Sequence, residues 1–146
     1  MVVNELKIFT EAYLCGKGTS SEELKRRLAA SNPGSMVQVI RGSAARNEVF
    51  VEMLSAQTLH AELAGSMLAK KPEIDFLLRM AGTTQISRAI GDQGAKAGDQ
   101  FLLVVAGRTP PRGTGDLKDL ELPRMELSAA ELRRIEKAAL LNAERA

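Results

Sequence analysis

Two segments of the chain carry the start signal of a helix followed by apolar residues at helical spacing. Ser20 and Glu23 form a capping box, in which the serine hydroxyl serves a backbone amide and the glutamate can reach back. Leu24 and Leu28 follow, so we expect a helix that ends near Asn32-Pro33-Gly34. A second capping box, Ser128-Ala129-Ala130-Glu131, opens a C-terminal helix. Its expected inner residues are Leu132, Ile135 and Ala139.

The longest helical pattern runs from about Ala45 to Lys70. Pro72 closes it, because the residue before a proline avoids the α region. One stripe of side chains at spacings of three and four is expected to face the core. Its members are Val49, Met53, Ala56, His60, Leu63 and Met67.

Two shorter helices are expected after this proline. The first runs from Glu73 to Met80, and Gly82 can supply the left-handed turn that ends it. Thr83 or Thr84 can cap the second helix, which Gly94 ends. The expected inner residues are Ile74, Leu77 and Leu78 in the first helix, and Ile86, Ala89 and Ile90 in the second.

Four segments have strand character. Val2–Phe9 shows a loose alternation with β-branched residues, and Met36–Ile40 is a compact apolar run. Phe101–Ala106 is apolar throughout, as strands covered on both faces usually are. Met125 and Leu127 suggest a last short strand, after a loop that spans Gly107 to Asp116.

Strands and helices mix along this chain without a regular βαβ alternation. We therefore expect an α+β fold, with a small mixed or antiparallel sheet and several surrounding helices. At 146 residues the chain has the length of one domain, which we place at residues 1–146.

Composition limits the kinds of nucleic-acid contact that the chain can make. Aromatic residues make up 3% of the chain, so a platform of rings on which bases stack is not visible. The net charge of +2 permits contact with nucleic acid but does not require it, because phosphate affinity depends on local clusters of Lys and Arg.

Candidate catalytic groups are few. His60 is the single histidine and lies on the apolar stripe, which favours a core or half-buried ring. Cys15 is the single cysteine and is expected to pack as a small hydrophobe. Gly16-Lys17-Gly18-Thr19-Ser20 looks like a phosphate-binding loop, but it lacks the first glycine of the Walker pattern. We expect no catalytic residue, no metal and no cofactor.

Cellular location is suggested by two features. Neither a signal-peptide pattern at the start nor an apolar run of membrane-spanning length is visible. One lone thiol suits a reducing compartment. We expect a cytoplasmic protein.

One block of about thirty residues is more specific than the rest: Glu73 to Ile90, followed by Gly94-Ala95-Lys96. It resembles the central region of the kinase-binding subunits of the KEOPS complex of archaea and eukaryotes. In that family an acidic residue and a Leu-Leu helix lead into a Gly-x-x-Gln-Ile turn, and then come an Ala-Ile helix, a Gly-x-Lys-x-Gly turn and an apolar strand. The matching residues are Asp75, Gly82, Gln85, Ile86, Ala89, Ile90, Gly94, Lys96 and Gly98.

The resemblance implies an accessory subunit without catalytic activity of its own. KEOPS makes the threonylcarbamoyl-adenosine next to the anticodon of tRNAs that read codons beginning with A. In that assembly this subunit binds a small atypical kinase/ATPase and helps to present tRNA, including its single-stranded 3′ CCA end.

Residues near the two short helices are the expected RNA contacts. Cations flank the helices, and the amides after Gly82 open a helix, where a phosphate is favoured. The family often has an arginine where this chain has Thr84, so this chain departs from the pattern there. Arg41 and Arg46, before the long helix, are further cations of interest. The expected RNA-binding set is Lys70, Lys71, Arg79, Gly82, Thr83, Thr84, Gln85 and Arg88.

The kinase contact is harder to place on the sequence. Phe76 and Met80 on the first short helix, or Leu140 and Leu141 on the last helix, are candidate apolar anchors. Two other functions stay open at this point. One is a general protein–protein interaction module without a nucleic-acid role, and the other is an enzyme that uses Cys15 or His60.

Overall fold

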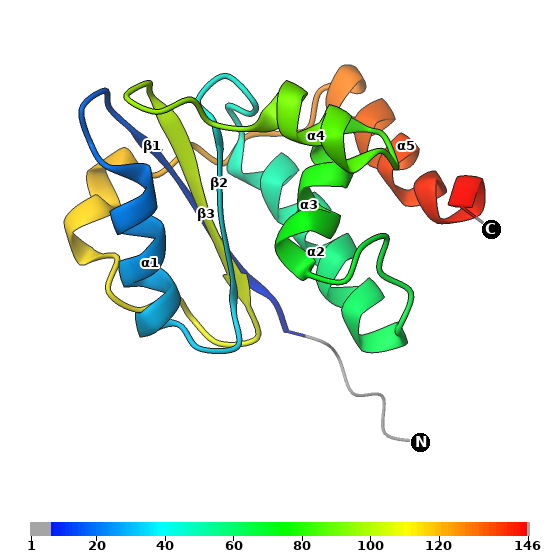
Figure 1. Ribbon diagram of the computed structural model, residues 1–146, viewed down its shortest axis with the longest axis horizontal. Helices are drawn as coiled ribbons and strands as arrows, with labels where there is room; N and C mark the ends of the chain where they lie inside the picture. The colour runs from blue at the N-terminus through cyan, green and yellow to red at the C-terminus, as the bar shows by residue number, and fades with distance from the viewer. Residues whose placement is uncertain (1–6, 146) are drawn as a thin grey trace.

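A three-stranded antiparallel sheet forms the centre of the molecule. The computed structural model describes the backbone of residues 7–145 and the side chains of residues 7–143. The strands are β1 (Phe9–Cys15), β2 (Met36–Arg41) and β3 (Phe101–Gly107), in the order β1-β3-β2. This arrangement confirms the predicted α+β class, as one compact unit (Figure 1).

Helices cover both faces of this sheet. Helix α1 (Ser21–Ser31) and the 3₁₀ helix η1 (Gly115–Leu120) lie on one face (Figure 1). On the other face lie α2, α3, α4 and α5, with bounds Glu48–Ala64, Pro72–Ala81, Ile86–Gln93 and Ala129–Arg145. Within residues 7–145 we find no helix whose length and hydropathy together would carry it across a bilayer.

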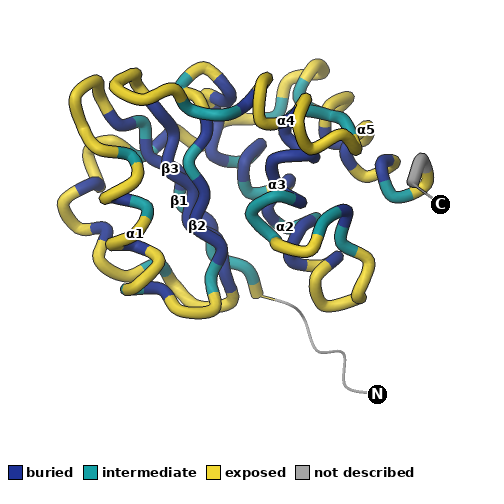
Figure 2. Tube along the Cα trace, viewed as in Figure 1, coloured by how far each residue is buried: buried dark blue, intermediate teal, exposed yellow. Residues whose placement is uncertain are grey.

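The central strand β3 is buried along its whole length, as its unbroken apolar sequence predicts. Leu102 and Val104 belong to the core under α2 and α3, whereas Leu103 and Val105 belong to the smaller core under α1 and η1. In Figure 2 β3 is dark blue along its whole length, β1 and β2 are mostly dark blue, and the exposed residues of the helices are yellow. The alternation of side chains across one strand therefore supplies two cores.

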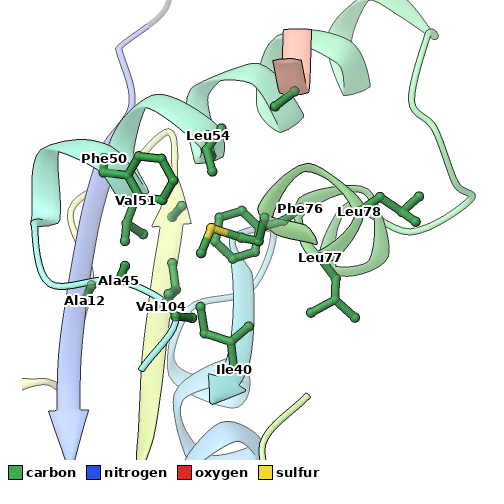
Figure 3. Close-up of a cluster of buried hydrophobic side chains, with 14 of the residues drawn as sticks. Ala12, Ile40, Ala45, Phe50, Val51, Leu54, Phe76, Leu77, Leu78 and Val104 are labelled. Carbon is green, nitrogen blue, oxygen red and sulfur yellow. The ribbon is translucent and has the colours of Figure 1, made fainter. Parts of the chain in front are cut away.

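The larger core is made by side chains from all three strands and from the helices of one face. Figure 3 shows Phe50, Val51 and Leu54 of α2 gathered with Phe76 of α3 and Val104 of β3. Large aliphatic and phenyl groups in such contact supply most of the folding free energy, at about 25 cal/mol per Å² of apolar surface buried.

Three of the predicted helix ends are confirmed in atomic detail. The Ser20 hydroxyl accepts a hydrogen bond from the Glu23 amide at 3.3 Å. At α5 the box is reciprocal: the Glu131 amide donates to Ser128 at 3.1 Å, and the Ser128 amide donates to the Glu131 carboxylate at 2.9 Å. Gly82 has a φ of +69°, so it ends α3 in the left-handed conformation that glycine tolerates best.

The long helix differs from its prediction in length and in orientation. It begins at Glu48 and ends at Ala64, because Gly65 adopts a φ of +68° and stops it well before Lys70. Its buried face carries Phe50, Val51 and Leu54 rather than the predicted stripe. Met53 and Leu63 of that stripe are 42% and 57% exposed. Helix α2 has two apolar faces, and the sheet takes the one with the phenyl ring.

The predicted inner faces of α4 and α5 are also wrong in part. Of the three predicted inner residues of α4 only Ala89 is buried, while Ile86 and Ile90 are 47% and 51% exposed. In α5 Ile135 is buried as predicted, but Leu132 and Ala139 are exposed. Ala138 and Leu141 are the other core residues of this helix. The N-cap of α4 is Gln85 rather than a threonine.

Both terminal strand predictions need correction. Residues 2–6 of the predicted strand Val2–Phe9 lie outside the described residues, and β1 itself begins only at Phe9. Met125 and Leu127 form no strand. The chain meets β1 before these residues, in a bridge between Glu121 and Tyr13 and in a hydrogen bond from the Leu122 amide to the Ala12 carbonyl at 2.8 Å. At Met125 the chain instead contacts Asn47, whose side-chain oxygen accepts from the Met125 amide at 3.1 Å and whose side-chain nitrogen donates to the Met125 carbonyl at 3.2 Å.

Glu48 is a carboxylate buried at the start of α2. It accepts hydrogen bonds from the Ala12 amide and from Arg124, each at 3.3 Å. Burial raises the pKa of Glu48 above its ordinary value, and the charge of Glu121 adds to the rise. The backbone and Arg124 contacts lower the pKa and offset only part of this cost.

A pH-dependent stability follows from this raised pKa. The folded protein holds the Glu48 proton more tightly than the unfolded chain does, so stability should fall as pH rises from about 4.5 through the raised folded pKa. Glu48→Gln should remove this part of the slope in unfolding free energies measured by urea titration at a series of pH values. Glu52→Gln is the matched control, since Glu52 contacts the same Arg124 at the surface. An unchanged slope in Glu48→Gln would contradict the assignment.

Candidate functional site

The turn between α3 and α4 lies at the surface. Gly82 donates its backbone N–H to the Leu78 carbonyl at 2.8 Å, and Thr83 donates to the same oxygen at 3.2 Å. The Thr83 hydroxyl accepts from the Gln85 amide at 3.2 Å. Thr84 and Gln85 are exposed, so the start of α4 is open to a ligand.

A pocket of about 620 Å³ adjoins this turn. Its lining combines apolar side chains from Ala69, Ile74 and Ile86 with Lys70 and Lys71. Both lysines are exposed at the N-terminal end of α3. The structure thus brings two predicted cations together with the first residue of α4, next to Gln85.

Arg88 is a separate surface cation on α4. Its guanidinium lies 3.9 Å from the Asp92 carboxylate, and both side chains are more than half exposed. Such a pair contributes little to stability, because water screens it. Arg88 is therefore available to a ligand at low cost.

Arg79 does not belong with these surface cations. The predicted RNA contact is buried, with 3% of the residue exposed. Its Nε donates to Asp75 Oδ1 at 2.7 Å and its Nη2 to Asp75 Oδ2 at 3.2 Å. Nη1 donates to the Ala138 carbonyl at 3.1 Å, and Nη2 also reaches Asn142 at 3.1 Å. Every face of the guanidinium is thus used inside the protein.

Two cations from α5 reach the same turn and were missed from the sequence. Arg134 donates to the Met80 carbonyl at 3.2 Å and lies over the Phe50 ring, 4.6 Å from its centroid. Burial in this contact lowers the pKa of Arg134, and the like charge of Arg41 contributes. A Cβ on Gly82 would lie 3.4 Å from the Lys137 side chain, so Lys137 passes directly beside the turn. Arg134 and Lys137 are three residues apart, which places them on one face of α5, but the sequence does not show which element that face contacts.

The predicted apolar anchors are mostly buried. Phe76, Met80 and Leu141 are core residues, whereas Leu140 is 62% exposed. Exposed apolar groups gather instead on α2 and α5, where a groove of about 490 Å³ runs between the helices. Its lining includes Met53, Ala56, His60, Ala64, Ala139 and Asn142.

Neither candidate nucleophile lies in a catalytic arrangement. His60 is exposed at the groove rather than in the core, which corrects its expected position. Cys15 is buried as expected, and burial raises the pKa of its thiol, which disfavours the reactive thiolate. Over the described residues, no three His, Cys, Asp or Glu side chains come close enough together to hold a metal ion.

Comparison with models of known protein families finds no match for this chain, and comparison with curated protein sequences finds none either.

The position of Arg79 leads to a stability prediction. Asp75→Ala should lower the free energy of unfolding by about 3–5 kcal/mol, because it leaves a buried guanidinium without its counter-charge. Urea unfolding followed by circular dichroism measures this. Glu73→Ala on the same helix is the control and should change stability by no more than about 0.5 kcal/mol. A loss in Asp75→Ala as small as in the control would show that the pair is not essential.

Proposed function

We propose that this protein is a non-catalytic adaptor of the KEOPS type, which binds a small atypical kinase/ATPase and recruits tRNA through its 3′ CCA end. The observation that carries the proposal is the pocket lined by Ile74, Ile86, Lys70 and Lys71 beside the exposed Thr83–Gln85 turn. This pocket lies within and just before the block that resembles the KEOPS subunits.

The chemistry of this pocket suits the unpaired end of an RNA strand. Isoleucine side chains offer apolar surface to an unstacked base, and two ammonium groups at the rim can contact the adjoining phosphates. The number of such cations is small, so a long duplex would find few contacts here, whereas a short single-stranded end needs few.

The groove between α2 and α5 is the proposed kinase-facing surface. Met53 lines this groove, Leu63 and Leu140 are exposed on the same two helices, and none of the three belongs to a core of the described residues. A stable partner surface needs about 800 Å² on each side, with apolar anchors near its centre. The same groove favours the second candidate, a protein–protein module without RNA, since its apolar lining requires no nucleic acid.

The RNA-binding half of the proposal is tested by reversing the two lysines. Lys70→Glu with Lys71→Glu should weaken binding of intact tRNA about tenfold and reduce the salt slope by about 1.4, because two contacts to single-stranded phosphates are lost. Filter binding at several salt concentrations measures both quantities. Removal of CCA from the tRNA should weaken its binding to the natural protein and should weaken its binding to the variant little further.

A matched control carries the same change of charge elsewhere. Arg108→Glu with Arg112→Glu alters the loop after β3, where both residues are exposed and neither lines this pocket. This control should bind tRNA almost as the natural protein does. Equal losses in the two double variants, or equal binding of tRNA with and without CCA, would contradict the proposed site.

The kinase-binding half is tested by placing charge on the groove. Met53→Asp with Ala139→Asp, two exposed residues that line the groove from α2 and from α5, should prevent co-purification of a KEOPS-type kinase and leave tRNA binding unchanged. Both side chains are already exposed, so the fold should survive the change. Leu120→Asp is the control, since Leu120 is an exposed leucine of η1 on the other side of the sheet. Retention of the kinase by the double variant would exclude this groove.

A further inference from the structure

Three cations from different parts of the chain meet at one end of the sheet. Lys17 lies in the turn after β1, Arg41 ends β2, and Lys96 precedes β3. All three line one pocket of about 420 Å³, together with Gly42, Gly91 and Gly94. This volume is within the range of small-ligand sites, about 300–1,000 Å³.

The backbone around this pocket is fixed on two sides. Gly42 donates to the Gln100 carbonyl at 3.2 Å, and a Cβ on Gly42 would lie 3.0 Å from that oxygen. Gly94 forms a bridge to Ile40, which ties the end of α4 to β2. Arg41 and Lys96 therefore project from segments that are held together before any ligand arrives.

The cations of this pocket take part in no salt bridge within the part of the chain that the structure describes. No carboxylate there forms an ion pair with Lys17, Arg41 or Lys96. Asp99 also lines the pocket and is the one carboxylate among its lining residues. Three positive charges against one carboxylate leave the site with an excess of two, which attracts a dianion.

We propose that this pocket binds a phosphate group, which contacts Lys17, Arg41 and Lys96. Lys17 belongs to the Gly16–Ser20 segment that fails the Walker pattern, and Lys96 belongs to the Gly94–Gly98 turn. The site is separate from the Lys70 and Lys71 pocket, and it does not depend on the function proposed above. Ile86 at the start of α4 lines one pocket, and Gly94 just past its end lines the other, about 12 Å apart along a helix of this length.

Two sources can supply such a group: a small phosphorylated compound or the backbone of an RNA strand. The test uses pyrophosphate as one probe and a twelve-nucleotide single-stranded RNA as the other, each added to ¹⁵N-labelled protein at constant ionic strength. The amide signals of the glycines at positions 16, 42 and 94 should shift in a saturable way. Sodium chloride, added to the same ionic strength in place of either probe, is the control.

Variants separate this site from its surroundings. Lys17→Ala and Lys96→Ala should each weaken binding about threefold, and about tenfold together, as expected for exposed charge pairs. Lys17→Arg should retain binding because the charge remains. Arg108→Ala, after the opposite end of β3, should change nothing. Lys70→Glu with Lys71→Glu should retain pyrophosphate binding, because these lysines line the other pocket. The phosphate site and the proposed RNA adaptor site can therefore fail independently of each other.

Each outcome decides the proposal. Saturable shifts with pyrophosphate that the lysine variants lose would assign the site to small phosphates. Shifts with RNA alone, lost in the same variants, would assign it to a backbone phosphate. Shifts with neither probe, or shifts that the Lys17 and Lys96 variants leave unchanged, would overturn it.

Discussion

The buried pair of Asp75 and Arg79 is the contact on which the helical layer of this protein depends. Asp75 Oδ1 accepts from the Thr58 hydroxyl of α2 at 2.5 Å, and its Oδ2 accepts from the Leu68 amide before α3 at 2.8 Å. Through Arg79 the pair continues to the Ala138 carbonyl of α5. Burying a charged group is costly unless it is paired. The hydrogen bonds of Asp75 and Arg79 therefore hold α3 in place against α2 and α5.

The proposed surfaces take their geometry from this layer. Because α3 is fixed at its core side, the turn at Gly82 and the start of α4 are held outward, with Ile86 beside Lys70 and Lys71. The same packing leaves the second apolar face of α2 open against α5. The chain thus offers aliphatic and cationic surfaces and, with aromatic residues at 3% of the sequence, few rings on which bases could stack.

Much of the local structure could be predicted because its causes lie within a few residues. The capping boxes at Ser20 and Ser128, the stop at Gly82 and the buried strand Phe101–Gly107 all follow from neighbours in sequence. Part of the candidate site could also be predicted from the sequence, since Lys70, Lys71 and Arg88 are exposed cations beside predicted helix ends. Arg79 was not, since an arginine four residues after an aspartate fits a solvated helix face as well as a buried pair.

The sequence by itself determined which segments are helical, where most of them end, and that one strand is covered on both faces. Those properties depend on hydrogen bonds and side-chain entropy within one or two turns. Tertiary structure alone decided which face of α2, α4 and α5 is buried, because each helix carries apolar residues on more than one side. For α2 the sheet selects the face, since Phe50, Val51 and Leu54 enter the larger core, whereas α4 packs against α3, and α5 packs against α2 and α3. The meeting of Lys17, Arg41 and Lys96 was decided in the same way, since distant loops are brought together only when the strands pair.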